Sequence, residues 1–222
     1  MNVYIDGFNF YYCAVKGTNY KWLDLSVLCN NLFPAKKVNK IKYFTAKVKA
    51  QKHNQDSPQR QAYYWRALRT IPNLEIIEGN FVTRPRLMPQ FPLAYIKDNY
   101  SRNPQKVQVE RTEEKGSDVN LAALLIYDNC TSDNDESVVI SNDSDLTLAI
   151  ELVTRDLGKE VIVVNPNRTR RAIKYKGCRM QNDLKRVATR SVLSINEVVL
   201  AKSMFPDILE DSKGNFHKPD KW

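Results

Sequence analysis

The sequence has only two histidines, His53 and His217, in 222 residues. They lie far apart in the chain, and both have polar neighbours. General acid–base catalysis near neutral pH usually relies on histidine. If this chain is a hydrolase, we therefore expect its chemistry to use carboxylates and a metal ion.

Cysteine is also sparse, and the four cysteines are scattered at Cys13, Cys29, Cys130 and Cys178. None forms a C-x-x-C pair, so the sequence does not indicate a zinc knuckle. A disulfide framework is not expected in a chain of this size without a signal peptide. The sequence predicts reduced thiols, most of them buried as small apolar groups.

Long apolar runs are missing, since no stretch approaches the roughly 18 apolar residues that span a bilayer. The first six residues, MNVYID, contain neither a basic segment nor a cleavage site. They are typical of the first strand of a cytoplasmic protein. We therefore expect a cytoplasmic protein without a membrane partner. The sequence leaves the oligomeric state open, a homo-oligomer included.

The chain carries a net charge of +9 and has a pI near 9.3. An excess of this size suits a polyanionic partner and favours nucleic acid. The alternative is a basic surface that only keeps the protein in solution.

Apolar segments with strand and helix spacing alternate along the chain, which predicts an α/β fold with a mostly parallel sheet covered on both faces. Residues 1–190 are expected to form one domain and residues 191–222 a loosely attached C-terminal extension. Within residues 1–190, the basic, proline-rich segment 83–106 is predicted to be an insertion. The expected strands are 3–5, 40–48, 74–77, 137–140 and 161–164, and Gly79 is expected to turn the chain; the expected helices are 8–15, 23–33, 57–71, 117–127 and 144–157.

Four aspartates occupy similar places in this pattern. Asp6 follows the first strand, Asp143 and Asp145 follow strand 137–140, and Asp118 begins the helix before that strand. Functional groups of open α/β sheets gather at the carboxyl ends of the strands. If the two strands are neighbours, the four carboxylates converge, and the cost of their repulsion calls for a cation.

Hard oxygen ligands without a nearby thiolate or imidazole suit Mg²⁺ or Mn²⁺. Such an ion can activate water and stabilise a leaving oxygen at a phosphodiester. Each aspartate also has a structural interpretation. Asp6-Gly7 is a turn pair, and Asp118, Asp143 and Asp145 are residues that favour helix caps and first turns.

The residues around these aspartates resemble a known family. IDGFN at 5–9 is similar to the opening motif of the NYN domains, which are relatives of the PIN-type nucleases. EEKGSDVNLA at 113–122 is similar to their second motif, and VISNDSDL at 139–146 to their third. The resemblance covers residues 1 to about 190, and the ending resembles that of a bacterial branch of the family. Asn142 departs from the pattern, because many relatives have glycine there.

The resemblance implies a PIN-like, three-layer α/β/α fold and metal-dependent endoribonuclease activity. The acidic residues of the family correspond to Asp6, Asp118, Asp143 and Asp145. Asn9 corresponds to the family's asparagine and is expected to orient a carboxylate or a metal-bound water, and Ser141 to do likewise.

Three basic groups are candidates for binding the phosphates of RNA. Lys115 lies beside the second motif. A second group follows the last strand: Arg168, Arg170, Arg171, Lys174, Lys176 and Arg179. The third is segment 83–106, in which Phe91, Tyr95 and Tyr100 lie among cations, a combination that suits single strands. The alternative for each group is a solvated basic surface, and for the aromatics, packing against the domain.

The leading functional hypothesis is a metal-dependent endoribonuclease that acts on single-stranded or structured RNA. A second hypothesis is a noncatalytic RNA-binding or adaptor protein that keeps the acidic cluster for folding or assembly. A third is a metal-dependent DNA nuclease or phosphatase that uses the same site. A contact to the 2′-hydroxyl cannot be recognised in one sequence, so RNA and DNA are not separated at this point.

Overall fold

The structure is a computed structural model that describes residues 1–50, 54–93, 104–168 and 178–220. In this part of the chain, seven strands form one sheet in the order β4-β3-β2-β1-β5-β6-β7. All neighbouring strands are parallel except β3 and β4. The expected α/β fold with a mostly parallel sheet is therefore confirmed.

The strands of this sheet and of the small C-terminal hairpin have the following bounds: β1 Asn2–Asp6, β2 Lys40–Ala46, β3 Leu74–Pro89, β4 Lys106–Lys115, β5 Glu136–Ile140, β6 Glu160–Val164, β7 Arg190–Val192, β8 Ile208–Asp211 and β9 Gly214–His217. The helices are α1 Gly7–Phe10, η1 Tyr11–Val15, α2 Leu25–Leu32, α3 Ser57–Leu68, α4 Ser117–Thr131, η2 Ser144–Leu146, α5 Thr147–Glu151, η3 Leu152–Asp156, α6 Asn182–Val187 and α7 Glu197–Ala201.

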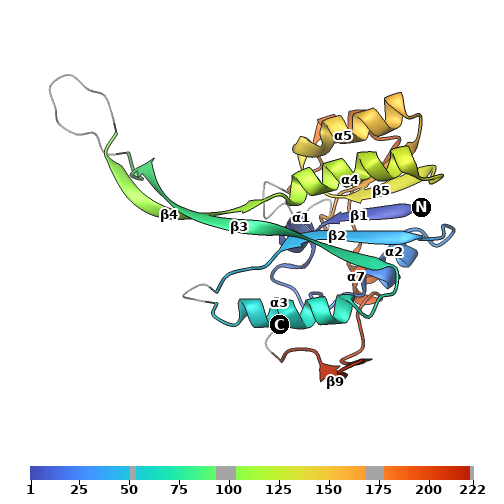
Figure 1. The fold of residues 1–222 in the computed structure, drawn as a ribbon, viewed down its shortest axis with the longest axis horizontal. Coiled ribbons are helices and arrows are strands. Elements are labelled where there is room, and N and C mark those ends of the chain that lie inside the picture. The colour runs from blue at the N-terminus through green and yellow to red at the C-terminus, as the bar shows by residue number, and fades with distance from the viewer. Residues whose placement is uncertain (51–53, 94–103, 169–177, 221–222) are drawn as a thin grey trace.

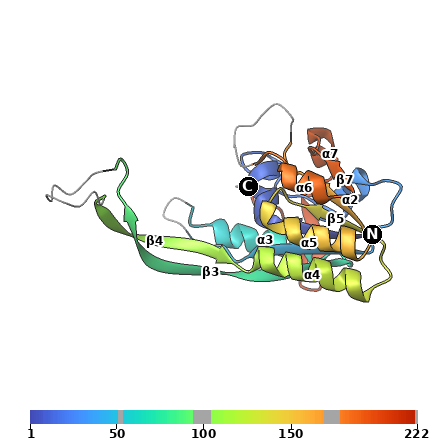
Figure 2. The same ribbon diagram turned by 90° about the horizontal axis from the view of Figure 1, so that it is seen from above.

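Helices cover both faces of the sheet, as Figures 1 and 2 show. Helices α2, α3 and α7 lie on one face, and α4, α5 and α6 on the other. The central strand β1 shows why: Val3 and Ile5 belong to the first apolar cluster, whereas Tyr4 belongs to the second. Successive side chains of a strand point to opposite faces. A central strand that is apolar on both faces requires a helical layer on each side.

β3 and β4 extend beyond the body as a long two-stranded arm (Figure 1). They pair antiparallel from Asn80–Lys115 to Pro89–Lys106. The sequence assigned no secondary structure to the inserted segment 83–106, whereas residues 83–89 of that segment continue β3. The aromatics Tyr95 and Tyr100 of this segment lie outside the described residues.

Gly79 does not turn the chain, as the sequence suggested, but lies inside β3. A Cβ atom on Gly79 would lie 2.5 Å from Oε1 of Glu114 and 2.9 Å from the carbonyl oxygen of Lys115. The glycine therefore allows β4 to approach β3 closely as the arm leaves the body.

The C-terminal extension differs from the expected loose tail. β8 and β9 form a hairpin, and Phe216 of β9 is buried in the first apolar cluster. Arg66 of α3 donates two hydrogen bonds of 2.7 Å to the Asp211 carboxylate, and its guanidinium lies over the Phe216 ring. The indole of Trp22 donates to the Pro206 carbonyl at 3.0 Å. The hairpin is thus packed against the domain by one aromatic anchor and a paired arginine.

No helix in the described ranges is long and apolar enough to cross a membrane.

Candidate metal centre

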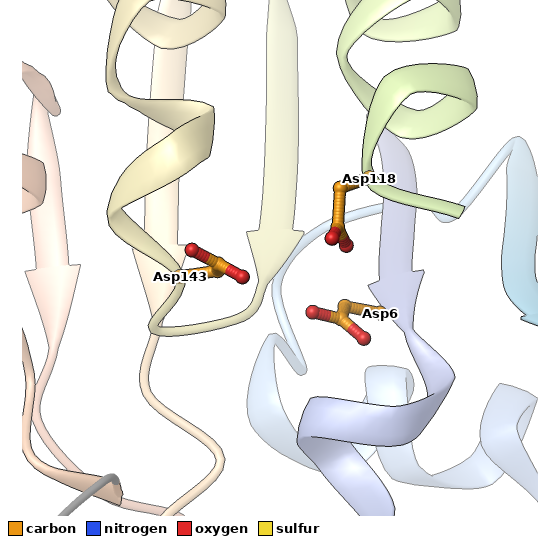
Figure 3. Close-up of side chains that lie close together, drawn as sticks. All are labelled: Asp6, Asp118 and Asp143. Atoms are coloured by element: carbon orange, nitrogen blue, oxygen red, sulfur yellow. The ribbon is translucent and has the colours of Figure 1, made fainter. Parts of the chain in front are cut away.

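Three of the four predicted aspartates converge at the carboxyl ends of the central strands. Asp6 ends β1, Asp143 follows β5, and Asp118 lies in the first turn of α4. Each contributes a carboxylate oxygen to a group whose members all lie within 4.8 Å of one another. Figure 3 shows the three side chains pointing toward a common centre. We call this group the acidic cluster.

Asp6 is held in place by its backbone surroundings. Its carboxylate caps α1 by accepting a hydrogen bond from the Asn9 backbone N–H at 2.9 Å, and it accepts another from the Ser141 hydroxyl at 2.9 Å. The next residue, Gly7, leaves no room for a side chain, since a Cβ atom would lie 2.6 Å from the Phe44 carbonyl oxygen. The Asp-Gly pair is therefore more than a turn: glycine lets the chain pass close over β2 while the aspartate faces the cluster.

Asn9 and Asn142 join the two loops that carry Asp6 and Asp143. The Asn9 side-chain amide donates to Oδ1 of Asn142 at 2.6 Å, and the Asn142 backbone N–H donates to Oδ1 of Asn9 at 3.2 Å. Asn142 is the residue at which the sequence departs from the NYN pattern. This side chain gives Asn9 a partner that glycine cannot supply.

Asp118 follows a chain reversal between β4 and α4. Gly116 has a φ of 103°, a conformation that favours glycine. Ser117 donates from its backbone N–H and from its hydroxyl to Oε1 of Glu114, at 3.0 and 2.8 Å. Glu114 thus accepts the first backbone N–H of α4 and lines the same cleft as Asp118. Sequence reasoning did not single out Glu114, because its role depends on how closely β4 packs against β3.

Asp143 and Asp145 lie in the same loop but are placed differently. The Asp143 carboxylate caps η2 by accepting from the Asp145 backbone N–H at 3.0 Å, and the Asp143 backbone N–H donates to the Ser141 hydroxyl at 3.1 Å. Asp145 is exposed and does not belong to the acidic cluster. Its charge still contributes to raising the pKa of Asp118.

The crowding of carboxylates perturbs their proton affinity. Burial raises the pKa of Asp6 to about 6, although its hydrogen bonds from Asn9 and Ser141 oppose the shift. Burial, followed by the charges of Asp6, Asp143 and Glu114, raises the pKa of Asp118 to about 7. The cluster is therefore costly when ionised, and no cation among the described residues forms an ion pair with its three carboxylates, which is the situation that a divalent cation relieves.

The donor set fits a hard cation, because every ligand atom that the cluster offers is a carboxylate oxygen. Asp6, Asp118 and Asp143 would hold a metal ion, with Asp145 and Glu114 nearby. Mg²⁺ binds through few carboxylates and keeps several waters, and Mn²⁺ accepts the same ligands. An ion held by these three carboxylates would supply a more acidic bound water and a positive charge in the cleft.

Metal binding is expected to depend on pH in a defined direction. Because the pKa values of Asp6 and Asp118 are raised to about 6 and about 7, protons compete with the metal below pH 7. We expect the Mn²⁺ affinity, measured by calorimetry, to fall roughly 20-fold from pH 8 to pH 6. An affinity that does not change over this range would contradict the assignment of these two carboxylates as ligands.

The same shifts set the pH dependence of the metal-free fold. A carboxyl whose folded pKa is raised binds protons more tightly in the native state, so stability is lost as pH rises from about 4 to about 7. Without metal, we expect a lower melting temperature at pH 8 than at pH 5.

Mn²⁺ at about 100 times Kd should add about 2.7 kcal/mol to the free energy of unfolding at pH 8. Asp143→Asn should blunt that increase, whereas Asp133→Asn, which changes an exposed aspartate outside the cluster, should not.

The cleft above the acidic cluster has a volume of about 610 Å³. Its other walls are Phe8, Asn9, Tyr12, Phe81 and a disulfide between Cys13 and Cys178. The prediction of reduced thiols is therefore wrong for this pair, whose Cα atoms lie 5.4 Å apart, a distance that a disulfide requires. A sequence separation of 165 residues hid the pairing. Cys29 and Cys130 are free thiols, and only Cys29 is buried.

The predicted phosphate-binding residues have different placements. Lys115 ends β4 with an exposed side chain that pairs with Glu113 at 3.1 Å. Arg168 forms an ion pair with Glu197, with 3.5 Å between its Nη1 and the carboxylate Oε1. The backbone carbonyl of Arg179 accepts a hydrogen bond from the Asn142 amide. Arg170, Arg171, Lys174 and Lys176 lie outside the described residues.

Comparison with known proteins gives a family match over most of the chain. The model of the NYN domain matches residues 1–179. A curated relative from Pseudomonas putida (strain DSM 28022 / S16) is 31% identical over 99% of this chain and 74% of its own length. That relative is named 6-hydroxy-3-succinoylpyridine 3-monooxygenase HspA.

A solved structure supports the fold. The chain is similar to a crystal structure of a protein of unknown function from Vibrio parahaemolyticus, with a TM-score of 0.51 and 17% sequence identity. The match covers 92% of this chain and 94% of that one. The likeness fits a PIN-like fold and, at this identity, carries no information on activity.

Proposed function

Because this chain belongs to the NYN domain family, we propose that it is a metal-dependent ribonuclease that hydrolyses phosphodiester bonds at the acidic cluster. The observation that carries the proposal is the convergence of Asp6, Asp118 and Asp143 within 4.8 Å at the strand ends. Three such carboxylates in one cleft, two of them with raised pKa values, suit a divalent cation better than any role in folding.

In this proposal each residue has a separate task. Asp6, Asp118 and Asp143 bind Mg²⁺ or Mn²⁺, and the bound ion supplies a more acidic water and charge stabilisation at the phosphate. Asn9 and Ser141 are positioning residues, because the Asn9 side chain links the two loops through Asn142 and the Ser141 hydroxyl donates to Asp6. Asp145, which lies outside the cluster, is proposed to accept a hydrogen bond from a water bound to the metal or to hold a second ion.

RNA is the proposed substrate because it combines the required charge with the chemistry of the family. The net charge of +9 favours a polyanion. Lys115, which follows the cleft residue Glu114, is proposed to contact a phosphate. Arg168, together with Arg170, Arg171 and Lys174, is proposed to contact the backbone of the strand outside the cleft. A cytoplasmic location remains part of this proposal.

The test is to incubate the purified protein with labelled RNA and with labelled DNA of the same sequence, in Mg²⁺, Mn²⁺ or EDTA. The proposal expects internal cleavage of RNA that requires the metal and stops with EDTA. Cleavage of DNA but not RNA would show that the substrate is DNA. Binding of RNA without cleavage under all metal conditions would favour the noncatalytic adaptor.

The name of the Pseudomonas relative supports a second candidate, a monooxygenase acting on a hydroxypyridine that carries a carboxylate. A monooxygenase inserts one oxygen atom of O₂ and takes two electrons from a reductant. Incubation with 6-hydroxy-3-succinoylpyridine, a reduced nicotinamide cofactor and O₂ tests it directly. Substrate-dependent oxygen uptake would establish this candidate, and its absence together with RNA cleavage would exclude it for this chain.

A further inference from the structure

A second pocket lies next to the acidic cleft and has the opposite charge. It has a volume of about 370 Å³, within the range of small-ligand sites. Phe8 and Tyr12 line both hollows, so α1 and η1 form the partition between them. The other walls come from β2, α3 and the segments that follow η1 and β2.

Four cations line this pocket: Lys16, Lys21, Lys49 and Arg60. None of the described lining residues is an aspartate or glutamate. Within the described part of the chain, the three lysines form no ion pair with a carboxylate, and Arg60 has only the exposed Asp56 at 3.8 Å. Burial, followed by the charge of Arg60, lowers the pKa of Lys21. The pocket thus gathers positive charge without neutralising it, which suits an anion.

Aromatic rings line the same pocket. Tyr11 and Tyr12 are 38% and 51% exposed, and their rings contact edge to face with centroids 5.4 Å apart. The Lys16 ammonium lies 4.4 Å from the centre of the Tyr12 ring. Buried Trp65 and partly buried Tyr64 also line it. Exposed rings beside cations are the combination with which proteins stack a base and hold its phosphate.

We propose that this pocket binds a nucleotide of the single strand that enters the acidic cleft, with its base on Tyr11 or Tyr12 and its phosphate on Lys21 and Arg60. The inference rests on the proposed nuclease function, because a single strand that is cleaved in the acidic cleft extends past this neighbouring pocket. The scissile phosphate lies at the metal, and the neighbouring nucleotide crosses the partition at Phe8 and Tyr12. The substrate class is therefore single-stranded RNA.

The first test measures binding separately from cleavage. A fluorescein-labelled single-stranded RNA pentanucleotide is titrated in EDTA and followed by fluorescence anisotropy. Lys21→Gln/Arg60→Gln should lower the affinity by roughly tenfold and flatten the log–log salt dependence by about 0.7, since the two cations contact one phosphate and each neutralised phosphate contributes about 0.7 for single strands. The glutamines keep much of the side-chain stem, and thermal melting verifies that the variant is folded.

The matched control is Lys36→Gln/Arg190→Gln, which removes the same charges at the opposite edge of the sheet, where both residues pair with Glu136. This control variant should have the same salt slope as the wild type.

A second variant tests stacking: Tyr11→Ala should weaken RNA binding by about tenfold, and Tyr11→Phe should restore it, because a base stacks on the ring alone.

The outcomes separate this inference from the proposed function. If the wild type cleaves RNA in a metal-dependent way and the Lys21/Arg60 variant binds RNA as tightly as the wild type, the proposed nucleotide pocket is wrong and the nuclease function stands. Binding lost in that variant, with no cleavage by the wild type, would retain the pocket and overturn the nuclease. If the variant instead loses affinity only for 6-hydroxynicotinate, a hydroxypyridine carboxylate, the pocket is a small-molecule site and the inference is wrong.

Discussion

Replacing Asp143 by Asn is expected to lower kcat/KM for RNA cleavage by about 1,000-fold. The change removes one negative charge from the acidic cluster and so weakens metal binding and the charge stabilisation that the ion provides. The side-chain Oδ1 that accepts from the Asp145 backbone N–H remains, and asparagine caps helices as well as aspartate does. The fold should therefore persist while the activity is lost.

Three measurements make this expectation specific to the cluster. Asp6→Asn should have an effect of similar size, because Asp6 contributes to the same group of ligand atoms. Asp133→Asn, an exposed aspartate outside the cluster, should cleave at the wild-type rate. RNA affinity in EDTA should not fall in the cluster variants, since repulsion of phosphate is reduced. Cleavage within tenfold of the wild type in Asp143→Asn would exclude this aspartate as an essential ligand.

Phe216→Ala is expected to reduce the free energy of unfolding by about 3 kcal/mol or more, the usual cost of truncating a buried phenylalanine. Phe216 is 3% exposed and lies under the Arg66 guanidinium, so its loss also removes the contact that places the Arg66–Asp211 pair. Urea unfolding followed by circular dichroism measures the change. His217→Ala, at the neighbouring exposed position of β9, should change stability by less than about 0.5 kcal/mol.

A loosely attached C-terminal extension would give a different result. In that case Phe216→Ala and His217→Ala would unfold at the same urea concentration. Equal midpoints would show that the hairpin adds nothing to the stability of the domain.

The central part of the fold was predictable because its strands are short apolar runs that lie between segments with helical spacing of apolar residues. β1, β5 and β6 have four consecutive buried residues each, and this continuity is what a parallel sheet with two covered faces requires. The acidic cluster was predictable for a related reason. Aspartates that directly follow neighbouring parallel strands share one edge of the sheet.

Other features depend on contacts that the local sequence does not express. The arm was missed because Gly79 and the prolines of β3 suggest turns, whereas an edge pairing with β4 accommodates them. The C-terminal hairpin has three apolar residues, Ile208, Leu209 and Phe216, of which Ile208 is exposed, and a single buried aromatic anchor has no periodicity to detect. Asp145 follows the motif, yet the short helix η2 leaves its side chain exposed and outside the cluster.

The order of the strands also determines when the acidic cluster comes into existence. β1 is synthesised first but occupies the middle of the sheet, with β2 on one side and β5 on the other. Asp6 therefore meets Asp143 only after residues 136–146 have left the ribosome and β5 has paired with β1. A nascent chain that ends earlier has Asp6 and Asp118 without their third partner. Under the proposed function, the metal site is therefore completed only when β5 has paired with β1.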